Sequence, residues 1–581
     1  MKIRQSPPAY EDANLQDYEA AYASFRWSDV EREFDWYRSG KLNMAHEAID
    51  RHCRTERKDK IALYYLSEER DEQYTFEQLR TLSNKFANAL RGLGIGKGDR
   101  VFIFMPRAPE VHISFMGIAK VGAIVGPLFE AFMEEALRDR LQDSEAVAII
   151  TTPELKTRIP KHELPALKHI ILVGAKGPLE PGEVSYEEIM SHADEEAEVE
   201  WVDREDPLIL HYTSGSTGKP KGVLHVHYAM VGHYQTSKWV LDLKDNDVLW
   251  CTADPGWITG TSYGIYGPWL MGATVVLRGG RFDPQKCYAT IDKYRVTVWF
   301  SAPTAFRRMM ATGDELRHRY SLGSLRHILS AGEPLNPAVI TWAQHTLGMP
   351  IYDNWWMTES GMQLIANYRC LPIKPGSMGK PVPGVVATIL DDEGKELPPN
   401  QIGNLAIQAG WPAMMRQIWR NERKYREYFP YDSWFISGDS AYRDEDGYYW
   451  FEGRIDDIIK TSGERVGPFE VESVLLEHPA IVEAGVIGKP DPLRGQIIKA
   501  FVCLREDYEE SEELKQEIME FVRKNLAAHA VPREIEFECA LPKTRSGKIM
   551  RRVLKAWDLG LPTGDLSTMD DSDHFHDQDG H

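Results

Sequence analysis

The apolar run Leu208-Ile-Leu210 leads almost directly into Tyr212-Thr-Ser-Gly-Ser-Thr-Gly-Lys-Pro-Lys-Gly222, and these two stretches decide the fold. The run is typical of a buried strand. In the segment after it, glycines let backbone N–H groups approach phosphate oxygens, hydroxyls donate further hydrogen bonds, and Lys221 adds positive charge. A Walker A loop is excluded because proline follows Lys219. The segment therefore predicts a cradle for an anion, and the alternative, a linker rich in Gly and Ser, rarely adjoins a buried strand.

Short apolar runs on both sides of this segment alternate with helical patterns. The apolar residues at positions 79, 82, 86, 90 and 93 share one helix face, and Thr75 with Gln78 resembles a capping box before it. The alternation of strands and helices implies parallel βαβ units and a sheet covered on both faces. The expected strands are residues 101–105, 123–125, 146–151, 208–212, 248–253, 273–277 and 296–300.

The pattern differs at the two ends of the chain. Residues 1–75 are weakly periodic and are expected to form a surface-wrapping extension of short helices. Beyond residue 385, short strands separated by turns predict a β-rich module, and the residues after Asp456 suffice for a small α+β domain. Six aspartates after Gly564 predict a disordered tail. We expect an α/β protein with a large N-terminal domain (1–455, β-rich module about 385–455), a small C-terminal domain (456–563) and an acidic tail (564–581).

Composition indicates an ordinary globular protein and disfavours several functions. Of 581 residues, 43% are hydrophobic and 27% charged, and 88 acidic against 68 basic side chains give a net charge of −20. That balance disfavours a nucleic-acid or anionic-membrane protein. The six cysteines are too far apart for CxxC pairs and fit a reducing compartment. The first thirty residues hold no apolar signal, and no apolar stretch approaches about 18 residues, so a cytoplasmic protein is expected.

Four further segments follow the glycine-rich loop. They are Ala331-Gly-Glu-Pro334, Tyr352-Asp-Asn-Trp-Trp-Met-Thr-Glu-Ser-Gly361, Ser437-Gly-Asp439 with Gly453-Arg-Ile-Asp-Asp457, and Pro542-Lys-Thr-Arg-Ser-Gly-Lys548. In this order, together with the loop, they resemble the signature set of the adenylate-forming superfamily. The resemblance is nearest to the short bacterial AMP-forming acetyl-CoA synthetases. It implies a ligase that converts a carboxylate, ATP and CoA into an acyl-CoA, AMP and pyrophosphate through an acyl-adenylate.

The resemblance also implies nucleotide-binding roles that suit the chemistry of each residue. Glu359 would ligate Mg²⁺, which prefers hard oxygen ligands, and Thr358 would bond the α-phosphate. Trp355 would offer adenine an aromatic face, and Asp439 with Arg454 would bind the ribose. The residues implied in the ATP and AMP site are Thr213, Ser214, Gly215, Ser216, Thr217, Gly218, Lys221, Gly332, Glu333, Pro334, Asp353, Asn354, Trp355, Asp439, Arg454 and Arg465.

Lys548, in the small C-terminal domain, is the implied catalytic lysine. By its neighbours alone, the basic run around it would be a solvated surface. The resemblance instead makes Lys548 the charge that bridges the carboxylate and the α-phosphate. In this family the small domain then rotates, here about a hinge at Asp456, so that another face meets CoA. The implied CoA-binding residues are Arg140, Ser462, Gly463 and Arg523.

A short acid is the implied substrate. Short-chain members of the family block the acyl pocket with a tryptophan, and Trp356 has that position here. Ile258, Thr259 and Ala331 complete the implied pocket. Where acetate pockets commonly carry valine, Ala331 enlarges this one and Ile258 reduces it. A methylene is worth about 1–3 kcal/mol of discrimination, so acetate is expected as the main substrate and propionate as a secondary one.

Other functions use part of the same pattern. An enzyme that passes a short acyl group to a carrier protein would share the first half-reaction, and a medium-chain acyl-CoA synthetase would lack the block at Trp356. A binding protein without activity would not need every polar group. Acylation of Lys548 would remove the charge needed for adenylation, so a lysine acetyltransferase and a deacetylase are expected partners. The tail histidines at positions 574, 576 and 581 are a weak candidate for a metal site.

Overall fold

The apolar run at residues 208–210 lies in strand β8 (Pro207–Ser214), which pairs antiparallel with β9 (Pro220–Val226). The glycine-rich loop therefore joins the two strands of a hairpin, and the chain continues from it into a strand rather than a helix. The computed structural model describes residues 12–214, 220–461, 464–505, 507–544 and 548–563, together with Leu566 and Met569. Most of this loop and nearly all of the predicted acidic tail lie outside the described residues.

β8 belongs to an eight-stranded sheet with the order β19-β9-β8-β4-β3-β5-β6-β7, parallel from β8 to β7. Alternate residues of β3 (Arg100–Phe104) face two different hydrophobic cores, with Val101 and Ile103 on the side of α5 and α6, and Phe102 and Phe104 on the side of α7. Both faces are therefore covered, as the apolar runs predict. The other elements here are β4 (Ile124–Leu128), β5 (Ala148–Thr151), β6 (His169–Leu172), β7 (Glu183–Ser185), β19 (Gln417–Ile418), α5 (Phe76–Gly92), α6 (Pro109–Lys120), α7 (Glu134–Ser144), α8 (Pro153–Lys156) and α9 (Tyr186–His192).

A thirteen-stranded sheet has the order β17-β18-β20-β21-β16-β15-β14-β13-β12-β10-β11-β1-β2. The pairs from β14 to β1 are parallel and carry the site at their carboxyl ends, whereas the strands from β15 to β17 are antiparallel. The strands are β1 (Ile61–Leu66), β2 (Asp71–Thr75), β10 (Val248–Cys251), β11 (Thr274–Arg278), β12 (Val298–Ser301), β13 (His327–Ser330), β14 (Ile351–Trp355), β15 (Ile365–Ala366), β16 (Ser377–Pro381), β17 (Ala387–Leu390), β18 (Gly403–Gln408), β20 (Trp434–Arg443) and β21 (Tyr449–Arg454).

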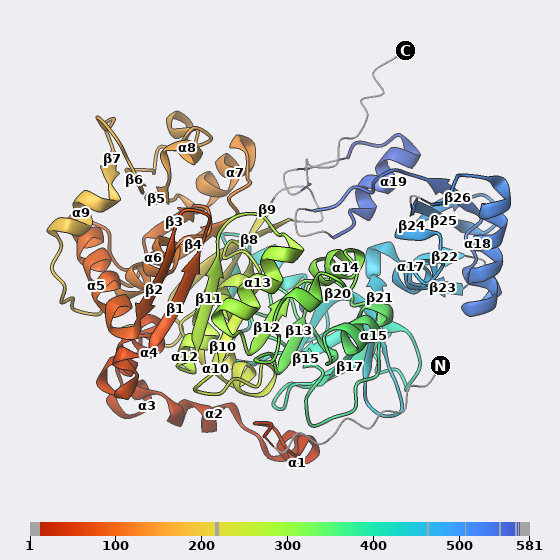
Figure 1. Cartoon of the computed structure of the whole chain (residues 1–581), viewed down its shortest axis with the longest axis horizontal. Coiled ribbons are helices and arrows are strands. Elements are labelled where there is room, and N and C mark those ends of the chain that lie inside the picture. The colour runs from red at the N-terminus through yellow and green to blue at the C-terminus, as the bar shows by residue number, and fades with distance from the viewer. Residues whose placement is uncertain are drawn as a thin grey trace.

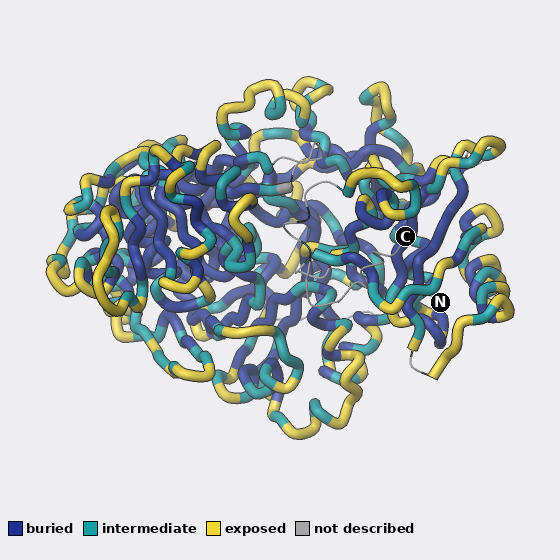
Figure 2. The backbone as a smooth tube through the Cα atoms, turned by 90° about the horizontal axis from the view of Figure 1, so that it is seen from above, coloured by how far each residue is buried: buried dark blue, intermediate teal, exposed yellow. Residues whose placement is uncertain are grey.

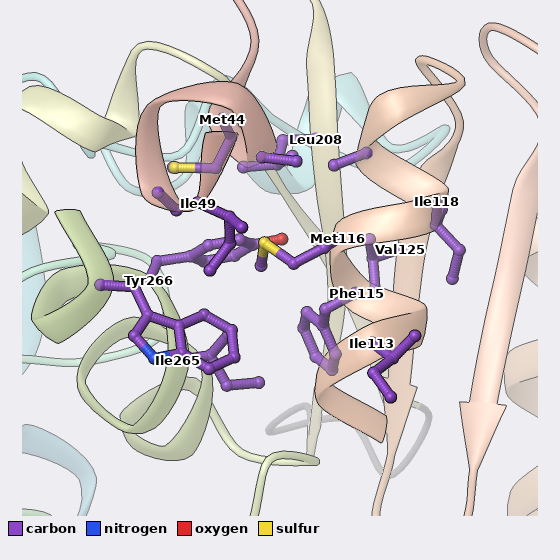
Figure 3. Close-up of a cluster of buried hydrophobic side chains, with 14 of the residues drawn as sticks. Met44, Ile49, Ile113, Phe115, Met116, Ile118, Val125, Leu208, Ile265 and Tyr266 are labelled. Carbon is purple, nitrogen blue, oxygen red and sulfur yellow. The ribbon is translucent and has the colours of Figure 1, made fainter. Parts of the chain in front are cut away.

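One hydrophobic core joins the two large sheets. It contains Val125 of β4 and Val275 of β11, together with side chains of α6 and of the π-helical turn Ser262–Tyr266 (Figure 3). Because each sheet buries one face in this shared core, the position of the two sheets relative to one another is fixed. The helices between and around the sheets are α10 (Ala229–Trp239), α11 (Ile258–Thr261), α12 (Gly267–Leu270), α13 (Pro284–Tyr294), α14 (Pro303–Ala311), α15 (Pro337–Thr346) and α16 (Glu422–Arg426).

A separate five-stranded sheet lies at the C-terminal end of the chain, at the right of Figure 1. It has its own core, formed with α17 and α18, so its packing does not depend on the larger part. In Figure 2 buried segments of the chain run through the interior, and exposed segments follow the outline of the molecule. The elements are β22 (Ile459–Thr461), β23 (Glu464–Val466), β24 (Ile481–Asp491), β25 (Gly495–Leu504), β26 (Glu534–Phe537), α17 (Pro468–Leu475), α18 (Glu512–Asn525) and α19 (Arg551–Leu559).

The predicted α/β class is confirmed, and individual elements follow the sequence pattern closely. Helix α5 begins with both bonds of the capping box, Thr75 N–H to Gln78 Oε1 at 2.8 Å and Gln78 N–H to Thr75 Oγ1 at 3.1 Å. The N-terminal extension forms the short helices α1 (Tyr18–Ser24), α2 (Trp27–Val30), α3 (Asp35–Ser39) and α4 (Met44–Ala48) along one edge of Figure 1.

The N-terminal extension differs from the sequence prediction, because it also contains β1 and β2, which close one edge of the thirteen-stranded sheet. The strands of the β-rich module continue the parallel sheet in antiparallel fashion through β15 and β16. No helix within the described part of the chain is long and apolar enough to cross a membrane.

The seam between the large part and the C-terminal sheet contains a buried acid. Phe451 of β21 and Phe469 of α17 make an edge contact across the seam, with ring centroids 6.0 Å apart. Beside them Glu452 is 6% exposed, and its Oε2 has no hydrogen-bond partner among the described residues. Burial, reinforced by the charge of Glu470 on α17, raises the pKa of Glu452 to about 8. The folded protein therefore holds a proton here at neutral pH.

We expect Glu452→Gln to stabilise the protein at alkaline pH and to have little effect in acid. Between the ordinary glutamate pKa and about 8, the folded state keeps a proton that the unfolded state releases, so wild-type stability falls as pH rises through this window. Each pKa unit corresponds to about 1.4 kcal/mol. The measurement is the melting temperature of both proteins from about pH 5 to about pH 9. The exposed Glu445→Gln is the control, and a pH-independent difference for Glu452→Gln would contradict the expectation.

Candidate active site

A cleft of about 1530 Å³ lies at the carboxyl ends of the parallel strands of the thirteen-stranded sheet. Its walls come from the residues after β10, β12, β13 and β14, from the β20–β21 pair, and from the C-terminal part of the chain. Carboxyl ends of parallel strands meet at one edge, where loops carry side chains free of the ladder. The cleft therefore collects polar groups from segments that are far apart in the sequence.

A buried ion pair lies on one wall of this cleft. Lys221 Nζ on β9 is 2.7 Å from Glu359 Oε1, and the Tyr428 hydroxyl donates to the same oxygen at 2.8 Å. Lys221 also donates to the Tyr428 hydroxyl. Burial raises the pKa of Glu359, but Lys221 and Tyr428 outweigh it and leave the pKa below its ordinary value. Glu359 is therefore an ionised carboxylate although only 4% of its surface is exposed.

Tyr428 is a site residue that the sequence analysis missed. It belongs to none of the five quoted segments and follows helix α16 in an aromatic stretch before β20. Only the tertiary structure brings its hydroxyl to Lys221 and Glu359. No spacing rule in the sequence indicates such a contact.

Asp439 and Arg454, the two residues predicted to bind the ribose, form an ion pair. Arg454 Nη1 is 2.9 Å from Asp439 Oδ1, and the indole N–H of Trp355 donates to Asp439 Oδ2 at 2.9 Å. Gly438, with φ +80°, makes this possible, because a Cβ there would lie 2.6 Å from an Arg454 nitrogen. Trp355 thus orients the carboxylate in addition to presenting a ring to the cleft.

The segments after β13 and along β14 line the floor of the cleft. Glu333 pairs with Arg307 at 2.7 Å, and Gly332 has φ +100° at the turn before it. The Asn354 amide donates to the Ser330 carbonyl at 2.9 Å. Burial raises the pKa of Asp353 well above its ordinary range. Pro334 completes this wall, so the residues from 332 to 334 and from 353 to 355 meet in one place.

The loop that carries Thr358 and Glu359 is held from behind. His225 Nε2 lies 2.8 Å from the Thr358 carbonyl oxygen, and its Nδ1 lies 3.0 Å from that of Ala413. The Ser360 hydroxyl accepts from Met357 N–H at 3.0 Å. The loop therefore has little freedom to move, and Thr358 faces the cleft.

The residues predicted to form the acyl pocket also meet in this cleft. Ile258, Thr259, Ala331 and Trp356 all line it. Trp356 is 8% exposed and packs edge-on against Tyr263, with centroids 5.0 Å apart. The Tyr263 hydroxyl in turn accepts from Gln363 N–H at 2.9 Å. The indole therefore rests on a fixed support.

Lys548 lines the same cleft from the C-terminal side. Its N–H donates to Thr544 Oγ1 at 3.0 Å, and its carbonyl accepts from Thr544 N–H at 2.8 Å. The Lys548 side chain is exposed to the cleft, and desolvation by the surrounding protein, together with the charge of Arg454, lowers its pKa. Asp439 opposes that effect. Lys548 thus acts electrostatically on the Asp439–Arg454 pair across the cleft.

Two of the predicted CoA-binding residues, Arg140 and Arg523, do not line the cleft. Arg140 is 1% exposed, donates to the Ala136 carbonyl at 2.7 Å and stacks 4.1 Å from the Phe132 ring, so the structure gives it no route to a CoA phosphate. Arg523 lies on α18, on the outer side of the small sheet. Asp456 lies in the turn Ile455–Asp457 at the cleft. Gly215, Ser216, Thr217, Gly218, Ser462 and Gly463, and the side chains of Ser214 and Arg465, lie outside the described residues.

The cleft suits a divalent cation that arrives bound to a nucleotide better than it suits a metal ion held by protein side chains alone. Within the described ranges no cluster of three or more His, Cys, Asp or Glu residues could hold a metal ion. The Glu359 carboxylate lines the cleft, and so does Thr213, whose buried Oγ1 has no hydrogen-bond partner among the described residues. Such a set fits Mg²⁺ carried by phosphates, because that ion keeps most of its ligands from water and substrate.

Comparison with known proteins agrees with this geometry. The model of the AMP-binding enzyme family matches residues 49–419, and that of the AMP-binding enzyme C-terminal domain matches residues 470–548. The chain is 60% identical to an acetyl-coenzyme A synthetase of Bacillus subtilis (98% of this chain, 100% of the relative) and 41% identical to one of Methanothrix thermoacetophila (92% and 86%).

Solved structures give the same result. An anthranilate CoA ligase in complex with anthranoyl-AMP superposes with a TM-score of 0.82 at 33% identity, covering 90% of this chain and 98% of that one. A benzoate CoA ligase from Burkholderia xenovorans gives 0.79 at 29% identity, covering 88% and 100%. The chain therefore belongs to the AMP-binding enzyme family, that is, to the adenylate-forming superfamily.

Proposed function

We propose that this chain is an AMP-forming acetyl-CoA synthetase that converts acetate, ATP and CoA into acetyl-CoA, AMP and pyrophosphate. One observation carries the proposal: Lys548, the Asp439–Arg454 pair and the Trp356 pocket line a single cleft. The name of the Bacillus subtilis relative supports acetate as the acid. The same reaction makes ATP, Mg²⁺ and CoA the required small molecules, and we propose that it takes place in the cytoplasm.

In the first half-reaction a carboxylate oxygen of acetate attacks the α-phosphorus of ATP, and the bond to the bridging oxygen breaks. Acetyl-adenylate forms and pyrophosphate leaves with the electron pair. The obstacle is repulsion between anions, so cations must stand where the charge gathers. Lys548 would span acetate and the α-phosphate, and Lys221 would hold the outer phosphates. Asp439 and Arg454 would fix the ribose so that the α-phosphate stays beside Thr358.

Mg²⁺ bound with ATP would supply further neutralisation of the phosphates, and Glu359 is the residue that would hold it. In this structure Glu359 is paired with Lys221. When Mg·ATP binds, Lys221 would pair with a phosphate oxygen instead, and Glu359 would hold the cation. The exchange replaces each lost contact by one of the same sign, so the buried carboxylate keeps a cation beside it.

In the second half-reaction the CoA sulfur attacks the carbonyl carbon of acetyl-adenylate, and the bond to the phosphate oxygen breaks, releasing AMP. We propose that the C-terminal domain rotates about Asp456 between the two steps, so that Lys548 leaves the cleft and residues 460–465 enter it. Ser462, Gly463 and Arg523 would then meet CoA, and Arg465 the nucleotide.

The proposed partners outside the small molecules are a lysine acetyltransferase and a deacetylase. Acetylation of Lys548 would remove a charge that only the first half-reaction needs. The side chain is accessible from the cleft, which is a condition for such a modification.

A second candidate function, acyl transfer to a carrier protein, shares the first half-reaction. Exchange of labelled pyrophosphate into ATP with acetate, propionate, butyrate or no acid, followed by addition of CoA, separates the two. Acetate-dependent exchange and acetyl-CoA with AMP on adding CoA are expected. Exchange without thioester would favour a carrier protein, and exchange only with longer acids would favour a medium-chain enzyme.

We expect Trp356→Gly to extend the acid specificity to butyrate and hexanoate. Removing the indole that packs on Tyr263 opens space at the end of the pocket, and each additional methylene accommodated is worth roughly 1–3 kcal/mol. The measurement is kcat/KM for each acid in the exchange assay. If the variant rejected both longer acids while still folding, the pocket would lie elsewhere.

Lys548→Gln is expected to abolish acetate-dependent pyrophosphate exchange while thioester formation from supplied acetyl-adenylate and CoA persists. Glutamine mimics an acetylated lysine and lacks the charge that the first half-reaction requires. The exposed Lys524→Gln in the same domain is the control. Equal loss of both half-reactions would remove the case for Lys548 as a switch between them.

A further inference from the structure

We propose that Tyr428 is a positioning residue that orients Glu359 and Lys221 for Mg·ATP. The inference rests on the proposed function, because it assumes that these two residues meet the cation and the phosphates. Three atoms carry it: the Tyr428 hydroxyl, Glu359 Oε1 and Lys221 Nζ. Each is in contact with the other two.

The Tyr428 hydroxyl donates a hydrogen bond to a negative group and accepts one from a positive group. It donates to Glu359 Oε1 at 2.8 Å and accepts from Lys221, whose Nζ is 2.7 Å from the same Oε1. The last torsion of a glutamate side chain is broad, so nothing intrinsic fixes the plane of this carboxylate. Two donors hold Oε1 in place, and this fixes the plane of the carboxylate. The direction in which Oε2 points is thereby fixed as well.

The ring of Tyr428 is held independently of its hydroxyl. It stacks on Phe435, with centroids 5.4 Å apart and planes 1° from parallel. Phe435 belongs to β20 and is fully buried. Lys221 Nζ also lies 4.8 Å from the centre of the Tyr428 ring. The ring therefore stays in place when the hydroxyl is removed, and the hydroxyl can be tested by itself.

The hydroxyl also decides what happens when the ion pair separates. If a lysine and a glutamate contact only each other, a ligand must break their ion pair before it can bind either residue. When Lys221 turns to a phosphate, the Tyr428 hydroxyl still donates to Oε1, so Glu359 keeps its orientation at the moment it takes up the cation. Without this donor, the buried carboxylate would be able to rotate. It would also lose a hydrogen bond that offsets part of the cost of removing its charge from water.

Tyr428→Phe keeps the stacked ring and removes the hydroxyl. Hydrogen bonds to charged groups are among the strong ones, so we expect Mg·ATP to bind about 10-fold or more weakly in calorimetry without acid. The KM for Mg·ATP in pyrophosphate exchange should rise by a similar factor, and more Mg²⁺ should be needed for half-maximal exchange at fixed ATP. The KM for acetate and thioester formation from acetyl-adenylate and CoA should be unchanged.

Tyr425→Phe is the matched control, because Tyr425 is a half-buried neighbour that packs on Phe429 and does not line the cleft. It should leave every readout at the wild-type value. Unchanged Mg·ATP binding in Tyr428→Phe would overturn the proposal, and so would equal weakening of both half-reactions, which would indicate a structural role. Wild-type binding of Mg·ATP without acid-dependent exchange would instead count against the proposed function and leave the effect of Tyr428 on binding measurable.

Discussion

A buried negative charge must always have a cation beside it, and in this protein that constraint falls on Glu359. An unpaired carboxylate at this depth would cost several kcal/mol. Lys221 satisfies it from the β8–β9 hairpin and Tyr428 from the segment before β20. Three parts of the chain that are distant in sequence are thereby joined at the wall of the cleft. In the proposed function, the cation bound with ATP would meet the same requirement when Lys221 pairs with a phosphate.

Two other carboxylates of the cleft also have a positive charge at their side. Asp439 is bonded to Arg454 and to the indole of Trp355, and Glu333 to Arg307. Such pairs are made in advance, so binding a nucleotide does not require these groups to be ordered or desolvated at that moment. Preorganisation of this kind needs rigid backbone behind it, and the short contacts of His225 to Thr358 and of Asn354 to Ser330 provide it.

The sequence predicted those features that depend on neighbouring residues or on short contiguous segments. Helix α5 follows from its apolar spacing and the Thr75 cap, and the core strands follow from apolar runs. The quoted segments indicated Lys221, Glu359, Lys548 and the Asp439–Arg454 pair, all of which line the cleft. Tyr428 could not be found in this way, because its contacts depend on how β20 packs, and β1 was missed because its pairing partner β11 is more than two hundred residues away. Arg140 shows the converse: a residue can match a motif position and yet be buried under its own helix.

The placement of the cleft residues on the fold reflects when each is needed. Those that would hold the nucleotide and the acyl group sit on strands or on loops fixed by buried hydrogen bonds, since both half-reactions use them. Lys548 differs, because its backbone is tied to the protein only through Thr544 in the hydrogen bonds described, and it stands on a domain with its own core. Such a support suits the proposal that Lys548 acts in the first half-reaction and leaves the cleft before the second.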